Sequence, residues 1–175
     1  MFHFPPVPSW DAFHPLIIHF PVALLFVAPV FVLIGALLPA RRGRALLYSA
    51  LLLMALGTAS TFFAVNTGEA AGKLADRTPE ITAAIEHHEA LAENTRLTFS
   101  VLTVVFALLL VAPLVRRRTP PGRVTNTVLP LVFLIIYGGA MVLLTNTADA
   151  GGRLVHQFGV HAMVPPEAAP VAQRD

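Results

Sequence analysis

The chain has 175 residues, of which 55% are hydrophobic and 13% are charged, and its formal net charge is +2. Charged residues are about half as frequent as in an average soluble domain, which excludes intrinsic disorder and an ordinary water-soluble globule. The sequence has no cysteine, which excludes disulfides, thiolate ligands and covalent haem attachment within this chain. The composition therefore predicts an integral membrane protein whose side chains offer nitrogen and oxygen donors.

Four apolar runs are each close to the ~20 residues that a bilayer core requires, and none contains Asp, Glu, Lys or Arg. They cover about residues 15–38, 45–65, 97–115 and 124–145. The runs predict an all-α integral membrane four-helix bundle within residues 15–163. Residues 1–14 are then a segment outside the membrane, and residues 164–175 are a flexible tail.

Arginines in the two short connections between spans predict the orientation of the bundle. These connections hold seven of the twelve basic residues, namely Arg41, Arg42, Arg44, Arg116, Arg117, Arg118 and Arg123. By the positive-inside rule both connections are cytoplasmic, and both termini face outward. The basic charge is thus interpreted as an orientation signal, and no nucleic-acid partner is predicted. In the outer segment, Thr78-Pro79 predicts the start of an amphipathic helix over about 79–96 that leads into the third span.

An internal repeat links the two halves of the chain. Residues 66–76 match residues 146–156 at five of eleven positions, and each copy follows the outer end of a span. The repeat predicts a bundle of two repeated helical hairpins. Glu69 and Asp149 occupy matching positions, which is consistent either with a shared capping turn or with a functional pair of carboxylates.

The seven histidines all fall on the predicted outer side: His3, His14, His19, His87, His88, His156 and His161. Imidazole is a common metal ligand, and two imidazoles are a usual ligand pair for haem b. A ring at His19, one turn inside an apolar run, needs a ligand or a hydrogen-bond partner to offset the cost of its burial.

The first hypothesis is a protein that binds haem b and transfers electrons at the outer face, with His19 and His88 as axial ligands. Because His88 would lie ~13 Å outside a span that begins at Leu97, the two rings meet only if that helix enters the membrane near Leu91. Other cofactor-binding candidates are alternative ligands or propionate partners: His156, His161, Arg96 and Arg153.

Two further hypotheses stay open. One is a non-haem transition-metal site with ligands drawn from His14, His19, His87, His88, His156, His161, Glu69 and Asp149. The other is a cofactor-free structural or partner-docking subunit of a homo- or hetero-oligomer, with interfacial histidines. No catalytic residue is predicted, and an electron-transfer or accessory role is favoured over an enzymatic one.

Three motifs resemble a known family. They are His14-Pro-Leu-Ile-Ile-His-Phe-Pro-Val-Ala-Leu24, His88-Glu-Ala-Leu-Ala92 and a Gly-Gly-x-Leu-Val pattern within Gly151–Val160. The whole four-span chain is similar to the bacterial DUF2231 family of predicted membrane proteins. This family often has Tyr and then His at the positions that His156 and Phe158 occupy here. The resemblance implies a four-helix protein of the bacterial cytoplasmic membrane, with a cytochrome c or Rieske-type protein as its redox partner.

Overall fold

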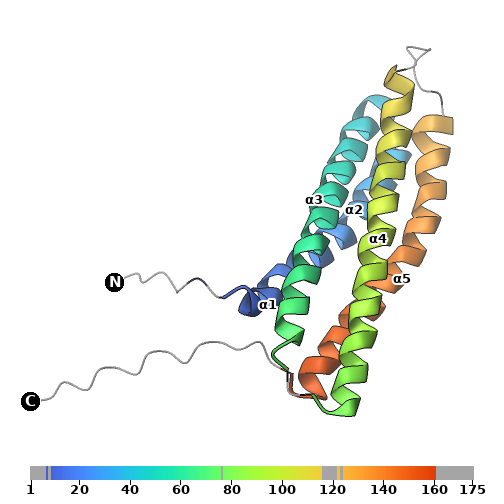
Figure 1. Cartoon of the computed structure of the whole chain (residues 1–175). Coiled ribbons are helices and arrows are strands. Elements are labelled where there is room, and N and C mark those ends of the chain that lie inside the picture. Colours follow the sequence, from blue (N-terminus) through green and yellow to red (C-terminus); the bar gives the residue numbers. More distant parts are fainter. Residues whose placement is uncertain (1–6, 8, 76, 116–121, 123, 161–175) are drawn as a thin grey trace, which may run out of the picture.

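The computed structural model describes residues 7, 9–75, 77–115, 122 and 124–160 (Figure 1). Its elements in chain order are η1 (Asp11–Phe13), α1 (His14–Ile17), α2 (His19–Leu37), α3 (Ala40–Gly72), α4 (Pro79–Val115), η2 (Val124–Val128) and α5 (Leu129–His156). Four long helices run side by side, and no described residue is in a β-strand. We call the end with Arg41, Arg42 and Arg44 the arginine end, and the end with His14 and His88 the histidine end. Residues 164–175, predicted to be a flexible tail, and the loop arginines Arg116–Arg118 and Arg123 lie outside the described part.

Four helices are long and apolar enough to cross a membrane, at 11–37, 40–72, 79–112 and 126–156. This confirms the predicted class, an all-α bundle with four candidate spans. Helices α3 and α4 have 33 and 37 residues, well above the ~20 that a bilayer core requires. Helix α4 begins where Thr78-Pro79 predicts a helix start, and the Ile81 N–H donates to Thr78 Oγ1 at 3.3 Å. It continues unbroken into the third apolar run.

The turn between α2 and α3 is tight because of the residues that form it. Leu38 precedes Pro39 and is extended, with φ −80° and ψ 158°, as the proline ring requires of the residue before it. Next to the turn, Gly35 near the end of α2 and Gly43 near the start of α3 bring the two backbones into contact. A Cβ atom at Gly43 would overlap the carbonyl oxygen of Gly35, so the absence of a side chain sets the distance between these helices.

The core lies along the axis of the bundle and contains an aromatic stack contributed by α4 and α5. The ring centroids of Phe106 and Phe133 are 4.7 Å apart, and those of Phe99 and Tyr137 are 5.4 Å apart. Tyr137 also joins the two halves of the molecule, because its hydroxyl donates to the carbonyl of Leu25 on α2 at 2.7 Å. That carbonyl lacks its normal helical donor, since Pro29 has no N–H.

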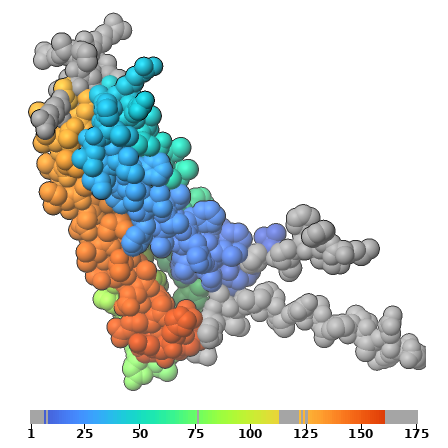
Figure 2. All heavy atoms as spheres, turned by 180° about the vertical axis from the view of Figure 1, so that it is seen from behind, coloured from blue at the N-terminus to red at the C-terminus, as the bar shows by residue number. Residues whose placement is uncertain are grey.

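The bundle is built from two hairpins, α1–α3 and α4–α5. Helix α2 packs mainly on α3, whereas α4 contacts α5 and α3 to a similar extent, and the contact between α2 and α5 is smaller. The looser seam is visible in Figure 2, where the blue N-terminal segment diverges from the orange and red part of α5 toward the histidine end. The outer surface is hollowed between them.

Candidate functional site

His14, at the start of α1, packs against the last turns of α3. Its Nδ1 atom lies 3.1 Å from Thr67 Oγ1. The Thr67 hydroxyl donates to the carbonyl of Phe63 at 2.8 Å, so it accepts from the imidazole. The carbonyl of Ala64, on the same turn of α3, is a second acceptor for the Thr67 hydroxyl at 3.1 Å. His14 is therefore held to α3 as a hydrogen-bond donor.

His88 occupies the matching place in the second hairpin. Its Nδ1 atom lies 3.1 Å from the carbonyl oxygen of Thr147 on α5. A carbonyl oxygen only accepts, so Nδ1 carries the proton. The Thr147 hydroxyl reinforces the same contact between α4 and α5, because it lies 2.7 Å from Thr95 Oγ1.

Each imidazole lies against a glycine of the facing helix. A Cβ atom at Gly68 would be 2.9 Å from Cε1 of His14, and a Cβ atom at Gly151 would be 2.9 Å from Cε1 of His88. Real Cβ atoms do not approach other atoms so closely, so the rings fit only because these positions have no side chain. Both glycines lie within the repeat segments but at different positions, because Gly68 aligns with Ala148 and Gly151 aligns with Ala71.

The two units, which we call the His–Thr–Gly units, consist of His14, Thr67 and Gly68 in the first hairpin and of His88, Thr147 and Gly151 in the second. Both histidine side chains are half-buried, and both lie at the histidine end of the bundle, near one another. Because each Nδ1 is a donor, the neutral form of each ring carries its lone pair on Nε2. The structure thus brings together two half-buried imidazoles with a basic nitrogen each.

The structure brings His14, rather than His19, to His88. His19 is exposed, and it lies about 140° around the helix from His14 because it is five residues further on. His87 and His156 are exposed as well, and His161 lies outside the described residues.

The remaining predicted residues lie around these units rather than in them. Glu69 and Asp149 are exposed on α3 and α5. Arg153 is exposed, and its Nε donates to Gln157 Oε1 at 3.1 Å. Arg153 and Arg96 stay predictions as propionate partners.

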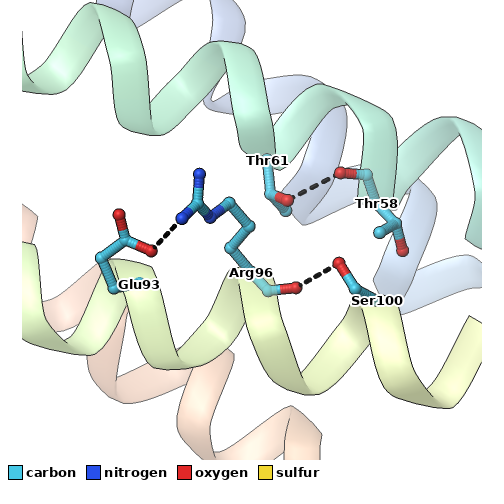
Figure 3. Close-up of polar contacts among 5 residues, drawn as sticks. All are labelled: Thr58, Thr61, Glu93, Arg96 and Ser100. Atoms are coloured by element: carbon cyan, nitrogen blue, oxygen red, sulfur yellow. Dashed lines mark hydrogen bonds and ion pairs between the residues drawn. The ribbon is translucent and has the colours of Figure 1, made fainter.

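The Arg96 side chain lies between α3 and α4, as Figure 3 shows. It forms an ion pair with Glu93, one turn before it, and its guanidinium lies 5.0 Å from the centroid of the Phe62 ring. Nearby hydroxyls are used within their own helices, since Thr61 donates to Thr58 O and Ser100 donates to Arg96 O. The charge of Arg96 is therefore compensated by Glu93 and by an aromatic face.

The seven described residues among the eight predicted metal ligands do not form a metal-binding cluster. Within the described part of the chain, no group of three or more His, Cys, Asp or Glu side chains is placed to hold a metal ion. The imidazoles of His14 and His88 are a pair without a third protein ligand in that part.

Sequence reasoning did not identify the threonines and glycines that hold the histidines. The signal was present in the internal repeat: each histidine precedes its repeat threonine by a similar distance, 53 residues for His14 and 59 for His88. An alignment of the hairpins on Thr67 and Thr147 places His88 opposite Pro8, which is six residues from His14 and eleven from His19, so it favours His14 over His19 without matching it directly.

Fold and site together define a class of protein, a four-helix membrane bundle of two repeated hairpins that each hold one imidazole against their second helix. The chain belongs to the DUF2231 family, described as predicted membrane proteins, whose family model matches residues 11–163. No curated protein and no solved structure compared with the chain matches it.

Proposed function

We propose that this protein binds haem b between its two hairpins, with His14 and His88 as axial ligands, and transfers electrons at the outer face of the bacterial cytoplasmic membrane. The observation that carries the proposal is the pair of repeat-related imidazoles, each anchored through Nδ1 and each with its lone pair on Nε2.

The number of donors suits haem better than a bare metal ion. A transition-metal ion usually takes three or four protein ligands, whereas the porphyrin supplies four nitrogens and leaves two axial positions for the protein. Two imidazoles complete that set. Haem bound in this way would supply a one-electron couple.

The surrounding residues prepare both rings for this role. A histidine ligand almost always donates its other N–H to an oxygen, which fixes the ring and raises the basicity of the ligating nitrogen. Thr67 Oγ1 and the Thr147 carbonyl are such acceptors. The hollow between the start of α2 and the end of α5 provides an approach from one side of the bundle (Figure 2).

The arrangement of charges supports the orientation in the membrane. Arg41, Arg42 and Arg44 lie at the end opposite the histidines, and the positive-inside rule makes that end cytoplasmic. The two imidazoles are then near the outer surface, within reach of a soluble one-electron carrier of the cytochrome c or Rieske type.

An absorption spectrum of the detergent-purified full chain tests the proposal. We expect a reduced-minus-oxidised spectrum with a b-type α band, and a low-spin signal in electron paramagnetic resonance of the oxidised form. Folded protein supplied with haem that shows neither signal would overturn the proposal, and elemental analysis would then test for a non-haem metal.

Matched variants identify the ligands. His14→Ala and His88→Ala are each expected to abolish the low-spin signal, whereas His19→Ala and His87→Ala should retain it. Gly151→Ala should displace His88 and lower haem retention about tenfold, whereas Gly152→Ala, which has open space around its Cβ position, should not. Loss of the signal in His19→Ala with retention in His14→Ala would favour the other pairing.

Cysteine labelling tests the orientation, because the native chain has no cysteine. In intact cells a membrane-impermeant maleimide should label Glu86→Cys, at the histidine end, and not Arg42→Cys. The opposite result would place the histidines in the cytoplasm.

A further inference from the structure

A second site lies beside His88, around α4 on the side where His87 projects. A groove of about 310 Å³ between α4 and α5 has polar walls formed by His87, Asn146, Asp149 and Arg153, and Leu91 and Phe158 contribute apolar surface. His87 and His88 are adjacent in the sequence and so project about 100° apart on the helix. The groove is therefore separate from the proposed haem site.

One wall of this groove is built by the residues that follow α5. The N–H of Phe158 donates to the Arg153 carbonyl at 3.3 Å, and the N–H of Val160 donates to the Leu154 carbonyl at 3.0 Å. Gly159 makes the reversal possible with φ +66°, a conformation that favours glycine. The chain thus folds back and holds the Phe158 ring at the groove.

The charged groups of the groove do not neutralise one another. Asp149 precedes Arg153 by four residues on one helix, the favourable order for an ion pair. Yet Glu93–Arg96 is the ion pair found in the described part of the chain, and Arg153 contacts Gln157 instead. A carboxylate and a guanidinium therefore face the same small space with hydrogen-bonding capacity to spare.

The depth of the groove matches the headgroup layer of a bilayer. The last apolar residues of α5 before the groove are Leu143 and Leu144, and Thr145 and Asn146 follow. Along the helix, Asp149 lies about 4 Å and Arg153 about 10 Å beyond Asn146. The polar layer on each side of the hydrocarbon core is roughly 5–8 Å thick, so Asp149 is at headgroup level.

We infer that this groove binds the phosphoethanolamine headgroup of a membrane lipid. The Arg153 guanidinium matches the phosphate, which it can bind through two parallel hydrogen bonds. The Asp149 carboxylate matches the ammonium group, and His87 and Asn146 add hydrogen bonds to the phosphate oxygens. Phe158 and Leu91 contact the glycerol and the first methylenes of the acyl chains.

The chemistry of the groove predicts selectivity among headgroups. Phosphatidylglycerol has no cation for Asp149, and the quaternary ammonium of phosphatidylcholine has no N–H to donate. Retention should therefore be strongest for phosphatidylethanolamine. The first hairpin offers a matched control, because Glu69 and Lys73 repeat the spacing of Asp149 and Arg153 on α3 and are not among the residues that line this groove.

Native mass spectrometry of the full chain in mixed micelles tests the inference, using the three lipids with identical acyl chains. We expect phosphatidylethanolamine adducts to exceed the other two about tenfold, and Asp149→Asn and Arg153→Gln each to remove most of that excess. Glu69→Gln and Lys73→Gln should retain it, and excess water-soluble phosphoethanolamine should compete.

Equal retention of the three lipids, or an equal loss in the Glu69 and Lys73 variants, would overturn the inference. Haem content is measured in Asp149→Asn and should stay constant, so failure of the haem proposal and failure of the lipid site are distinguishable. Circular dichroism verifies that each variant is folded.

Discussion

The two hairpins hold the same His–Thr–Gly unit but reach it differently. In the first, the helical segment is broken at Ile18, and the short α1 carries His14 onto α3. In the second, the unbroken α4 presents His88 in its third turn. The acceptor of the ring N–H also differs: it is a side-chain hydroxyl at Thr67 and a main-chain carbonyl at Thr147.

This difference shows which part of the unit is constrained. The path of the backbone into the site and the identity of the acceptor vary between the hairpins. The imidazole, the donated Nδ1–H and the glycine beneath the ring are present in both. The features common to both hairpins are explained better by a shared requirement for two oriented imidazoles than by the geometry of a helix end. The helix ends that carry His14 and His88 have different geometries.

The largest expected effect concerns the closure of the first hairpin. Gly43→Ala places a Cβ atom against the Gly35 carbonyl, and because backbone must move to relieve the overlap, we expect a loss of about 3 kcal/mol in the free energy of unfolding. Gly139→Ala in the second hairpin meets no atom within 4 Å and should be neutral or slightly stabilising. Unfolding in mixed micelles measures both, and equal stability of the two variants would refute the backbone contact.

The next effect concerns the junction between the hairpins. Tyr137→Phe removes the donor to the Leu25 carbonyl and leaves a buried acceptor unpaired, at a cost of about 2 kcal/mol. In a Pro29→Ala background the restored N–H of residue 29 can bond that carbonyl, so the same change should cost less. A double-mutant cycle measures this coupling, and an identical cost in both backgrounds would contradict the assigned role of Tyr137.

A smaller effect distinguishes the acceptor of the His14 ring N–H from the acceptor of the His88 ring N–H. Thr67→Val removes the acceptor of His14, so the ring loses its orientation and haem retention should fall about tenfold. Thr147→Val keeps the carbonyl that holds His88 and should leave haem retention unchanged, although losing the contact with Thr95 should lower stability by about 1 kcal/mol. Equal haem loss in both variants would show that the hydroxyls, and not the individual acceptors, matter.

The smallest effect tests a feature that only the second hairpin has. Glu93 follows His88 by five residues, and its counterpart after His14 is His19. Glu93→Gln breaks the ion pair with Arg96, and because both side chains are partly exposed, at 44% and 31%, we expect about 0.5 kcal/mol. His19→Gln should not change stability measurably. Thermal unfolding measures both, and a cost above about 2 kcal/mol for Glu93→Gln would indicate a more deeply buried pair.

Composition and periodicity predicted the membrane class, the four helices and the helix start at Thr78. They did not predict which histidines lie near one another, because the depth of each histidine in the membrane was counted from the end of the apolar run in its helix. In α4 that end lies near Leu97, yet His88 contacts Thr147, which is only two residues beyond the fourth apolar run. One face of the polar first half of α4 packs on α5 through His88 and Thr95, so the polarity of this segment does not by itself mark the membrane surface.

The packing of Gly68 and Gly151 against the imidazoles was hidden for a related reason. A glycine lowers the helical propensity of its segment, and by itself it does not indicate which side chain of a neighbouring helix packs against it. The contact depends on the crossing of two helices that are more than 50 residues apart in sequence, and no local pattern specifies that crossing. The repeat of Asn66-Thr67 at Asn146-Thr147 carried the one usable signal.

The bond between Tyr137 and Leu25 bears on how the protein assembles. Membrane helices insert first and associate afterwards, so each hairpin exists before it meets the other. Until then the Leu25 carbonyl, deprived of its helical donor by Pro29, has no partner in a medium without water, which costs several kcal/mol. Docking of α5 relieves this cost. A half-protein containing only α1–α3 therefore has an unpaired carbonyl at Leu25, which the hydroxyl of Tyr137 in the other half pairs. Although each hairpin holds its own histidine, the stability of the first depends on the second.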